Sequence, residues 1–548
     1  MAKTKFIFVT GGVMSGIGKG VATSSIGKIL QSKGYSVTAI KIDPYINVDA
    51  GTMTPTEHGE VFVTDDGLET DQDLGNYERF LDTNILSGNY MTTGRVYLSV
   101  INRERNLEYG GKNVEVVPDI PLEVISRIKR AAKTTKADFV LIEIGGTVGE
   151  YQNILFLEAA RMLKTENPED VLIFLVSYLP VPNKIGEMKT KPTQYAARSL
   201  NSVGIQPDFI LCRSEQPVDE VRKNKIALFC SVPKNHVIAS PDVDFIYEIP
   251  VNYDDERLGE KILSALKLKV KTKDLKDWRK EVERIRGIDK KIKIGIVGKY
   301  FNSGNFMLAD SYISVIESVK QAAWSNGYKP EIEWISSEDF EEDPKSIKRL
   351  KQLDGVIIPG GFGSRGIEGK ISTVKFLREN NIPLLGICYG MQIICIEFAR
   401  NVCGLKGANT TEIDQETKYP VIDIMPEQKK NLKEKNYGAT MRLGAYPAQL
   451  KTGTIAYSTY KTEAISERHR HRWEVSPEYI ETLESKGLVF SGKSPNGKLM
   501  EIAELKQKDH PFLLGTQFHP EFKTRFMKPH PIFNAFMKAA VKGKEGKK

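Results

Sequence analysis

Short apolar runs alternate with helical patterns along the first half of the chain. Apolar runs begin at Lys5, Tyr35, Asp138, Val171 and Asp208, and residues 20–34, between the first two, have a helical pattern. Continuous apolar runs of this kind are typical of strands that are buried on both faces of a sheet. The alternation therefore predicts a parallel sheet covered by helices.

The composition changes before the pattern starts again at about Ile292. Residues 266–291 are rich in charged side chains, and a helical pattern covers about residues 274–286. A charged stretch between two patterned regions is typical of a linker between domains. We therefore expect an interdomain linker that contains one exposed helix.

The second half has its own set of predicted strands. After the run at Ile292, further apolar runs begin at Gly355, Ile382 and Phe512. We expect an α/β protein with two domains: residues 1–270, a linker at 271–291, and residues 292–548. The polar run at 426–437 predicts a mobile loop or lid inside the second domain.

Residues 11–20, GGVMSGIGKG, follow the first predicted strand and lead into the first predicted helix. Free backbone N–H groups and the positive end of a helix face one point in such a loop, so it binds phosphate. Lys19 adds a full positive charge. The loop departs from the G-x-x-x-x-G-K-[ST] pattern, because Gly20 stands where Ser or Thr would bind Mg²⁺.

If Mg²⁺ is used, its oxygen ligands must come from elsewhere in the chain. Glu143 ends an apolar strand, where a buried acid needs a partner. Asp71 and Asp73 lie in a polar stretch, and a helix cap or surface acid is an equal alternative for Asp73. Glu143, Asp71 and Asp73 are therefore the candidate metal ligands.

Two other polar stretches suit anionic substrates. Lys41 and Asp43 end the second predicted strand, and a long polar loop follows past His58. Lys189 and Lys191 are two residues apart, so both can face one side of an extended segment and bind phosphate or carbonyl oxygens. A solvated loop is the alternative interpretation of these two lysines.

The second half contains a candidate nucleophile. Residues 386–390, G-I-C-Y-G, have the spacing of a nucleophile elbow, with Cys388 at its centre and a helix start that lowers a thiol pKa. His519 and Glu521 are two apart and supply a base and the group that orients it. The glycines of the run from Gly355 suit an oxyanion site. We expect Cys395 and Cys403 to be core residues.

Composition narrows the class of protein. Of the 548 residues, 40% are hydrophobic and 27% charged, and the net charge of +8 suits anionic small ligands or a solvated surface equally. The basic residues form no stripe with aromatic residues, so nucleic-acid binding is not expected. Five cysteines without C-x-x-C pairs fit a reducing cytoplasm without disulfides or zinc. We expect no signal peptide, since the first apolar core is too short, and no membrane span.

These motifs together resemble a known family. The second half resembles the class I glutamine amidotransferases, and ATMRLGAYP and ERHRHRWEV strengthen that match. The first half resembles the synthetase domain of the CTP synthase family in GGVMSGIGKG, KIDPYINVDAGTM, HGEVFVT, IEIGGTVGE, KTKPTQ and KIALFC. The resemblance implies a P-loop-like parallel-sheet synthetase domain followed by an amidotransferase α/β domain. It implies synthesis of CTP from UTP, ATP and L-glutamine, through UTP phosphorylated at O4.

The resemblance also implies roles for individual residues. It assigns ATP to Gly16, Ile17, Gly18, Lys19, Gly20, Val21, Asp73, Pro241, Asp242 and Val243, and Mg²⁺ to Asp73 and Glu143. It assigns UTP and CTP to Ser15, Glu150, Tyr151, Gln152, Lys189, Thr190, Lys191, Pro192, Thr193, Gln194 and Lys225. It assigns glutamine to Gly361, Tyr389, Gly390, Met391, Gln392, Glu412 and Arg472, with Cys388, His519 and Glu521 as the catalytic triad.

Two positions depart from the family. Gln152 stands where an acidic residue is common, so we expect CTP to inhibit this protein several-fold less tightly than its Gln152→Glu variant. Tyr389 stands where some relatives have Leu, which could change the glutamine pocket. The family further implies activation by GTP, a homotetramer and a coupling role for the region from Pro426, and filament assembly could coexist with catalysis.

Two other functions would also use parts of this sequence. A cobyric-acid-synthase-like amidotransferase also joins a variant phosphate loop to an amidotransferase half, but KTKPTQ and DPYINVDAGTM argue against it. A nucleotide-binding scaffold without catalysis is a different class of function. The presence of Lys19, Glu143, Cys388 and His519 argues against the scaffold.

Overall fold

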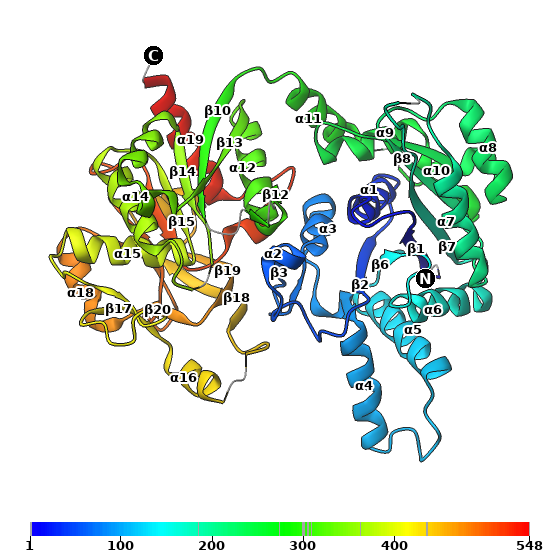
Figure 1. Cartoon of the computed structure of the whole chain (residues 1–548), viewed down its shortest axis with the longest axis horizontal. Coiled ribbons are helices and arrows are strands. Elements are labelled where there is room, and N and C mark those ends of the chain that lie inside the picture. The colour runs from blue at the N-terminus through cyan, green and yellow to red at the C-terminus, as the bar shows by residue number, and fades with distance from the viewer. Residues whose placement is uncertain are drawn as a thin grey trace. The chain divides into compact units, whose positions relative to one another are not determined.

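The computed structural model describes residues 3–184, 186–272, 274–298, 302–303, 306–307, 309–361, 363–434 and 437–546. The chain forms two compact units (Figure 1). Unit 1 comprises Met1–Ala50 and Asp73–Glu283, and unit 2 comprises Gly51–Gln72 and Arg284–Lys548.

The two units differ from the predicted domains at residues 51–72 and at the predicted linker, since residues 271–283 belong to unit 1 and residues 284–291 to unit 2. The sequence pattern predicted one continuous domain over residues 1–270, whereas residues 51–72 leave unit 1 and pack in unit 2. They carry the short helix α2 (Pro55–His58) and the hairpin of β3 (Val61–Val63) and β4 (Glu69–Asp71). A short segment of this kind shows no hydrophobic pattern that would assign it to a domain, because residues distant in the sequence bury its apolar side chains.

Unit 1 contains a parallel sheet of seven strands in the order β5-β2-β6-β1-β7-β8-β9. Its strands are β1 (Lys5–Gly11), β2 (Val37–Asp43), β5 (Tyr90–Thr92), β6 (Phe139–Thr147), β7 (Val171–Tyr178), β8 (Phe209–Ser214) and β9 (Val237–Pro241). Ile7 and Phe8 are neighbours in β1 and are 0% and 1% exposed, so both faces of the sheet are covered. The five predicted strands of the first half, and their parallel arrangement, are confirmed.

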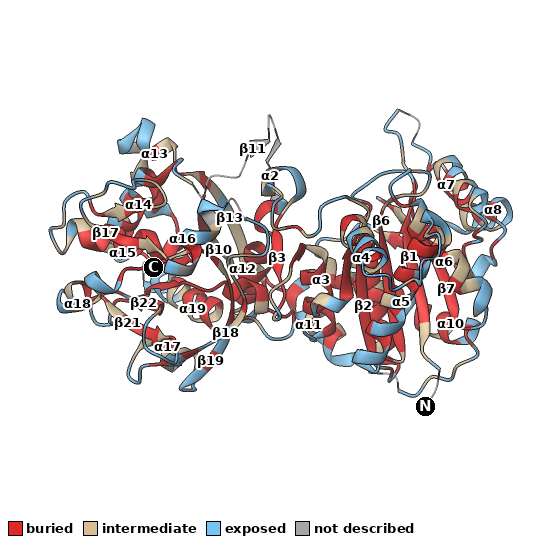
Figure 2. Ribbon diagram, turned by 90° about the horizontal axis from the view of Figure 1, so that it is seen from below, coloured by how far each residue is buried: buried red, intermediate tan, exposed pale blue. Residues whose placement is uncertain are grey.

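Helices connect the strands of unit 1. They are α1 (Lys19–Ser32), α3 (Asp73–Leu81), α4 (Thr93–Arg105), α5 (Val116–Thr135), α6 (Ile154–Glu166), α7 (Lys191–Ser202), α8 (Glu220–Cys230), α9 (Ile249–Asp255) and α10 (Leu258–Ala265), with the 3-10 helices η1 (Ser87–Asn89), η2 (Lys234–His236) and η3 (Ile246–Glu248). Figure 2 shows buried strands inside each unit and exposed residues along the outer helices. The helix α1 confirms the predicted helix after the glycine-rich loop.

Unit 2 contains a mixed sheet of nine strands in the order β13-β10-β14-β15-β23-β22-β21-β18-β19. The first five run parallel, and the remaining pairings are antiparallel. They are β10 (Lys291–Gly298), β13 (Lys329–Ser336), β14 (Gly355–Ile358), β15 (Leu384–Ile387), β18 (Arg442–Leu450), β19 (Ala464–His471), β21 (Val489–Lys493), β22 (Met500–Glu504) and β23 (Leu513–Thr516). The strands predicted at Ile292, Gly355, Ile382 and Phe512 are the parallel core β10, β14, β15 and β23.

Smaller elements complete unit 2. Its helices are α12 (Ile313–Ser325), α13 (Asp339–Glu342), α14 (Ile367–Glu379), α15 (Tyr389–Asn401), α16 (Pro426–Lys433), α17 (Ile455–Tyr460), α18 (Pro477–Ser485) and α19 (Pro531–Gly546), with the 3-10 helices η4 (Ala309–Tyr312), η5 (Pro344–Gln352) and η6 (Pro520–Lys523). Short strands are β11 (Asn302–Ser303), β12 (Phe306–Met307), β16 (Asn409–Thr410), β17 (Pro420–Ile424) and β20 (Trp473–Val475).

One prediction about a polar segment needs correction, and another gains detail. The linker helix is α11 (Lys276–Arg286), but it is not simply exposed, because Trp278, Val282 and Ile285 on one side are at most 3% exposed. The run at 426–437 predicts a mobile loop or lid, and residues 426–433 of it form the helix α16. Lys435 and Asn436 of that run lie outside the described residues.

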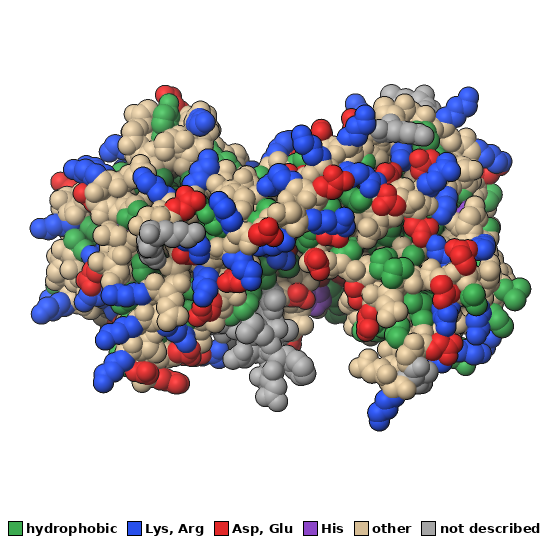
Figure 3. All heavy atoms as spheres, turned by 90° about the horizontal axis from the view of Figure 1, so that it is seen from above, with side chains coloured by type: hydrophobic (Ala, Val, Ile, Leu, Met, Phe, Trp, Pro, Cys, Tyr) green, Lys and Arg blue, Asp and Glu red, His purple; other side chains and the backbone are tan. Residues whose placement is uncertain are grey.

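Surface chemistry agrees with the mixed composition. On the face drawn in Figure 3, Lys and Arg side chains are interspersed with Asp and Glu. Each helix within the described residues is too short or too polar to cross a bilayer.

Candidate active sites

The glycine-rich loop of unit 1 joins β1 to α1. Gly16 and Gly18 have φ of 71° and 83°, a left-handed backbone that favours glycine. Lys19 is buried at the first turn of α1, and its ammonium donates a hydrogen bond to the Gly146 carbonyl at 2.8 Å. Burial lowers the pKa of Lys19, against the nearby carboxylate of Glu143, which raises it. The loop therefore places a partly desolvated cation at the carboxyl end of β1.

Gly20 explains why the loop lacks the usual hydroxyl residue. A Cβ atom at Gly20 would lie 2.0 Å from Oδ1 of Asp73, the first residue of α3. Any side chain at position 20 would therefore displace the Asp73 carboxylate. The structure replaces a hydroxyl on the loop with a carboxylate from α3.

Asp73 belongs to a buried cluster of charges around Lys41. The Lys41 ammonium pairs with Asp73 and lies 3.4 Å from Asp43 and 3.5 Å from Glu143. Burial would raise the pKa of Asp73, but Lys41 holds it below its usual range. The structure brings together both predicted metal ligands, Asp73 and Glu143, next to Lys19.

Glu143 is the most deeply buried acid of this cluster. It is 1% exposed, and the Tyr77 hydroxyl donates to its carboxylate. Burial and the negative charge of Asp73 raise the pKa of Glu143 to about 7. Mg²⁺ commonly binds one or two protein carboxylates together with substrate phosphates, and this pair of buried oxygens fits such an ion. Within the described residues, no three acidic, histidine or cysteine side chains form a larger metal-binding group.

Arg213 at the end of β8 connects the loop to the predicted ATP residues after β9. Its guanidinium donates to the Ile17 carbonyl at 3.3 Å and pairs with Asp242. A Cβ at Gly18 would lie 2.9 Å from Arg213 Nη1, so the guanidinium packs directly on the loop. The structure thus brings residues 16–21 and Asp242 to the same edge of the sheet, where ligands of α/β folds bind.

The residues predicted for UTP and CTP follow β1, β6 and β7 or lie in α7 and α8, and they differ in exposure. Tyr151 is 93% exposed, and Ser15, Gln152, Lys191 and Lys225 are also exposed. Thr190, Thr193 and Gln194 are buried. The Ser177 hydroxyl at the end of β7 donates to Thr193 Oγ1 at 2.8 Å, which fixes the start of α7.

The predicted lysine pair needs a correction. Lys191 is the first residue of α7 rather than part of an extended segment, because Pro192 favours a helix start. Lys189 instead pairs with Glu187 at 2.7 Å. Lys189, followed by Arg222 and Lys225, lowers the pKa of Glu187, so Lys189 and Lys225 lie near the same acid. Glu187 carried no signal in the sequence.

The nucleophile elbow of unit 2 lies between β15 and α15. Cys388 has φ 51° and ψ −99°, a strained conformation for a non-glycine residue. A Cβ at Gly386 would lie 2.7 Å from the Gly390 backbone, and one at Gly390 would lie 2.2 Å from the Ile358 carbonyl. Both glycines of G-I-C-Y-G are therefore required by close approach of the backbone.

The predicted triad residues meet at this elbow. His519 Nδ1 lies 2.7 Å from Glu521 Oε1, and a Cβ at Gly360 would lie 2.9 Å from His519 Cε1 and 3.7 Å from Cys388 Cβ. Burial disfavours the charged imidazole, but the Glu521 carboxylate and the Cys388 thiolate raise the pKa of His519 above its usual value. His519 Nε2 has no hydrogen-bond partner within the described part of the chain. The arrangement can hold an imidazolium beside a thiolate.

A cavity of about 610 Å³ in unit 2 opens onto Cys388, His519 and Glu521. Gly361, Glu412 and Arg472, three of the predicted glutamine residues, also line it. The other four, Tyr389, Gly390, Met391 and Gln392, form the first turn of α15 and do not line it.

Arg472 is held at the cavity by the segment that follows α16. Its guanidinium donates to Thr440 Oγ1 at 2.9 Å and to the Tyr437 carbonyl at 2.7 Å, and it also donates to Gln428 of α16. The polar run from Pro426 therefore forms part of the wall that positions a cation.

Residues 51–72 supply another part of this cavity wall. Gly51 to Pro55, Glu60 and Val61 line the cavity. Glu60 accepts hydrogen bonds from the backbone N–H and hydroxyl of Ser314, and Asp65 and Glu69 pair with Arg468 and Arg470 at 2.5 and 2.8 Å. The sequence pattern gave no sign that these residues belong beside Cys388.

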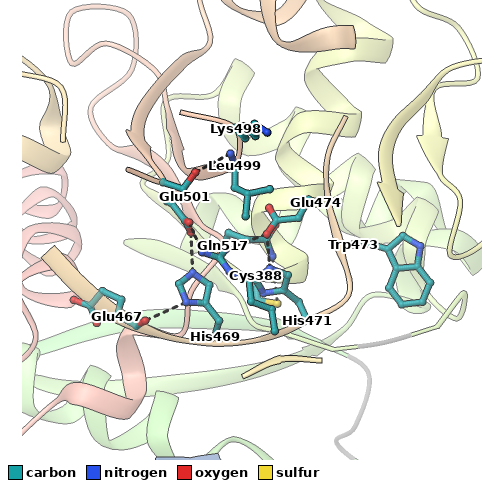
Figure 4. Close-up of polar contacts among 12 residues, drawn as sticks. Cys388, Glu467, His469, His471, Trp473, Glu474, Lys498, Leu499, Glu501 and Gln517 are labelled. Carbon is teal, nitrogen blue, oxygen red and sulfur yellow. Dashed lines mark hydrogen bonds and ion pairs between the residues drawn. The ribbon is translucent and has the colours of Figure 1, made fainter. Parts of the chain in front are cut away.

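Buried polar side chains also contact the nucleophile Cys388. Gln517 donates from Nε2 to Cys388 Sγ at 3.6 Å and accepts from Gln392 Nε2 at 3.3 Å. In Figure 4, Cys388 and Gln517 are drawn with the histidines of β19, and His469 Nε2 lies 2.7 Å from Glu501. Gln517 is the second residue of the TQFHPEF motif. The sequence shows the motif, but it does not show that Gln517 contacts Cys388.

Comparison with known proteins agrees with this arrangement. Residues 5–268 match the family described as CTP synthase N-terminus, and residues 307–539 match glutamine amidotransferase class-I. The CTP synthases of Pyrococcus abyssi and Pyrococcus furiosus are 51% and 52% identical to this chain over 546 residues, with 99% of each chain covered. The solved glutaminase domain of Trypanosoma brucei CTPS with bound acivicin is 35% identical, covers 46% of this chain and 94% of its own, and has a TM-score of 0.42.

The match of the N-terminal half to the CTP synthase domain removes the cobyric-acid-synthase-like alternative. The substrates that the family implies are ATP, UTP and glutamine. Since both halves match and the relatives align over nearly the entire length, the chain belongs to the CTP synthase family of glutamine-hydrolysing ligases.

Proposed function

We propose that unit 1 phosphorylates UTP and that unit 2 supplies ammonia from glutamine, with the residues assigned below. The observation that carries the proposal is the presence in one chain of two separate sites. One has a glycine-rich loop beside the buried Glu143 and the half-buried Asp73, and the other has Cys388, His519 and Glu521 at a cavity. ATP transfers its γ-phosphoryl group to uracil O4, ammonia attacks C4, and phosphate leaves.

In unit 2, the Cys388 thiolate attacks the carboxamide carbon of glutamine. Glu521 and the sulfur of Cys388 raise the pKa of His519, so its imidazole can donate the proton that leaves with ammonia. Water then hydrolyses the thioester with His519 as the base, which releases glutamate. Backbone N–H groups near Gly360 and Gly361 suit the developing oxyanion, and Gly360 lies against His519.

Recognition of free glutamine needs one group for its ammonium and one for its carboxylate. Glu412 and Arg472 line the cavity and carry the two opposite charges. We assign the ammonium of glutamine to Glu412 and its carboxylate to Arg472, because charge-assisted hydrogen bonds are the strongest available here.

In unit 1, the loop N–H groups and Lys19 bind the β- and γ-phosphates of ATP. Asp73 and Glu143 would hold Mg²⁺, which neutralises phosphate charge when bound. Lys41 already pairs with both carboxylates, so the cluster accommodates a cation. Arg213 fixes the loop through the Ile17 carbonyl and orients Asp242.

The regulatory part of the proposal rests on the family resemblance. It includes activation by GTP, inhibition by CTP and a homotetramer. The exposed apolar side chains on and between α4 and α5 suit a subunit interface, and they include Leu98, Ile101, Leu107 and Leu122. Gln152 is exposed at the turn after β6, where it can reach a bound pyrimidine nucleotide.

The direct test is synthesis of CTP by the purified full chain with UTP, ATP, Mg²⁺ and glutamine, and separately with ammonium chloride. We expect CTP with either nitrogen source and release of glutamate only with glutamine. ATP hydrolysis without any CTP would contradict the assignment.

A further inference from the structure

Tyr389 follows the nucleophile but does not line the glutamine cavity. Its side chain is 2% exposed and packs in the hydrophobic core of unit 2. The ammonium of Lys370, which is itself 1% exposed, lies 5.1 Å from the centre of the Tyr389 ring. A desolvated cation over an aromatic face is favourable, so the ring has a defined position.

The Tyr389 hydroxyl reaches the loop that follows β14. It donates a hydrogen bond to the Gly363 carbonyl at 3.3 Å. The N–H of the same Gly363 donates to Glu412 Oε1 at 2.7 Å. Gly363 has φ 83°, and a glycine in this region is free to change conformation unless other groups fix it.

One glycine is therefore held from two sides, by a phenol on its carbonyl and by a carboxylate on its N–H. Glu412 lines the cavity, so the position of Gly363 sets the position of the carboxylate that faces the substrate. A leucine or phenylalanine at position 389 could fill the same core space but could not donate to the Gly363 carbonyl.

We propose that Tyr389 is a positioning residue for glutamine recognition, acting through Gly363 on Glu412. This inference rests on the proposed hydrolysis of glutamine in unit 2. It assigns the Tyr389 side chain an indirect effect on substrate affinity rather than contact with glutamine. Packing of the Tyr389 ring and the contact with Lys370 fix the Tyr389 hydroxyl. The hydroxyl in turn fixes Gly363, and Gly363 fixes the Glu412 carboxylate.

The test is the Tyr389→Phe variant of the full chain, assayed by glutamate release. Loss of one neutral hydrogen bond is expected to raise KM for glutamine about fivefold. We expect kcat to stay within about twofold, because the variant leaves Cys388, His519 and Glu521 untouched and a twofold change is under 0.5 kcal/mol.

Tyr419→Phe is the matched control. Tyr419 also packs against the core of unit 2, and the Lys418 ammonium lies 5.0 Å from its ring centre. It does not line the cavity. We expect its KM and kcat for glutamine to equal those of the wild type.

A double-mutant cycle with Glu412→Ala identifies the route of the effect. If Tyr389 acts through Glu412, adding Tyr389→Phe to Glu412→Ala changes kcat/KM by less than twofold, although it changes the wild type about fivefold. Equal effects in both backgrounds, an unchanged KM in Tyr389→Phe, or a fall in kcat alone would overturn the inference. A wild-type protein that releases no glutamate would overturn the proposed function itself, which is a distinct result.

Discussion

At the scale of single residues, the glycine at position 20 and the position of the Asp73 carboxylate depend on each other. The carboxylate of Asp73 fills the space that a side chain at position 20 would need. A Cβ atom at Gly20 would lie 2.0 Å from Oδ1 of Asp73. Restoring the usual loop sequence would therefore harm this protein, because the new side chain would displace Asp73.

We predict that Gly20→Ser lowers CTP synthesis with ammonia by at least about tenfold, which corresponds to ~1.4 kcal/mol of lost stabilisation. Gly20→Ala should lower it to a similar extent, since the clash begins at Cβ. Steady-state rates of CTP formation measure the effect. Glutamate release should persist in both variants, and synthesis at the wild-type rate by Gly20→Ser would show that Asp73 can move without loss.

Glu143 gives a prediction for the dependence of stability on pH. Its pKa is raised to about 7 in the folded protein, above the ordinary 4.5 of an unfolded chain. The folded state therefore favours the protonated acid, and stability is lost as pH rises from about 4.5 to about 7.

Glu143→Gln removes this charge and keeps an acceptor for the Tyr77 hydroxyl. We expect the variant to have a higher Tm than the wild type at pH 8 without metal, by a few degrees, and a smaller difference at pH 5. Thermal unfolding in EDTA at both pH values tests the sign. An equal difference at the two pH values would contradict the raised pKa.

At the scale of elements, strand ends and one borrowed hairpin build the two sites. The loop after β1 carries the glycine-rich segment, the middle of β6 carries Glu143, and the end of β8 carries Arg213. The ends of β14, β15 and β23 carry the Gly360 loop, Cys388 and His519. Ion pairs to β19 and the packing of Phe62 on Phe522 hold the hairpin of β3 and β4.

Asp65→Ala tests how firmly that hairpin is held. It removes a carboxylate 2.5 Å from Arg468, whose side chain is fully buried, and breaking such a pair costs about 3 kcal/mol. We expect a Tm lower by several degrees and a higher KM for glutamine, since residues 51–55 line the cavity. The neighbouring Asp66→Ala, at an exposed position, should change both quantities little.

At the scale of the whole molecule, the residues proposed for each reaction lie within one unit. The triad and its cavity lie within unit 2, and the phosphate loop with its carboxylates lies within unit 1. The two chemistries should therefore be separable by single substitutions.

We predict that Cys388→Ala abolishes synthesis from glutamine and retains synthesis from ammonia, because ammonia bypasses the thiol. Lys19→Ala should lower synthesis from both sources by roughly a hundredfold or more, since both need phosphorylated UTP. Glutamate release should continue in Lys19→Ala. Loss of ammonia-dependent synthesis in a folded Cys388→Ala protein would contradict the assignment of the two reactions to separate sites.

Local patterns in the sequence predicted most of the parallel strands, the glycine-rich loop, the elbow at Cys388 and the His519–Glu521 pair, but not the parallel strands β5, β9 and β13. These features depend on residues within one turn or one strand, so the spacing of apolar residues and glycines is enough to identify them. The antiparallel strands β18, β19, β21 and β22 were not predicted, because they lack continuous apolar runs.

Only the tertiary structure decided which distant residues meet. Asp73 meets Gly20, Arg213 meets Ile17, Gln517 meets Cys388, and residues 51–72 join unit 2. Each of these contacts links segments that are distant in the sequence, and no local pattern shows that they meet. Their energy depends on burial and on opposite charge at short distance, and both arise only after the sheets have brought the segments together.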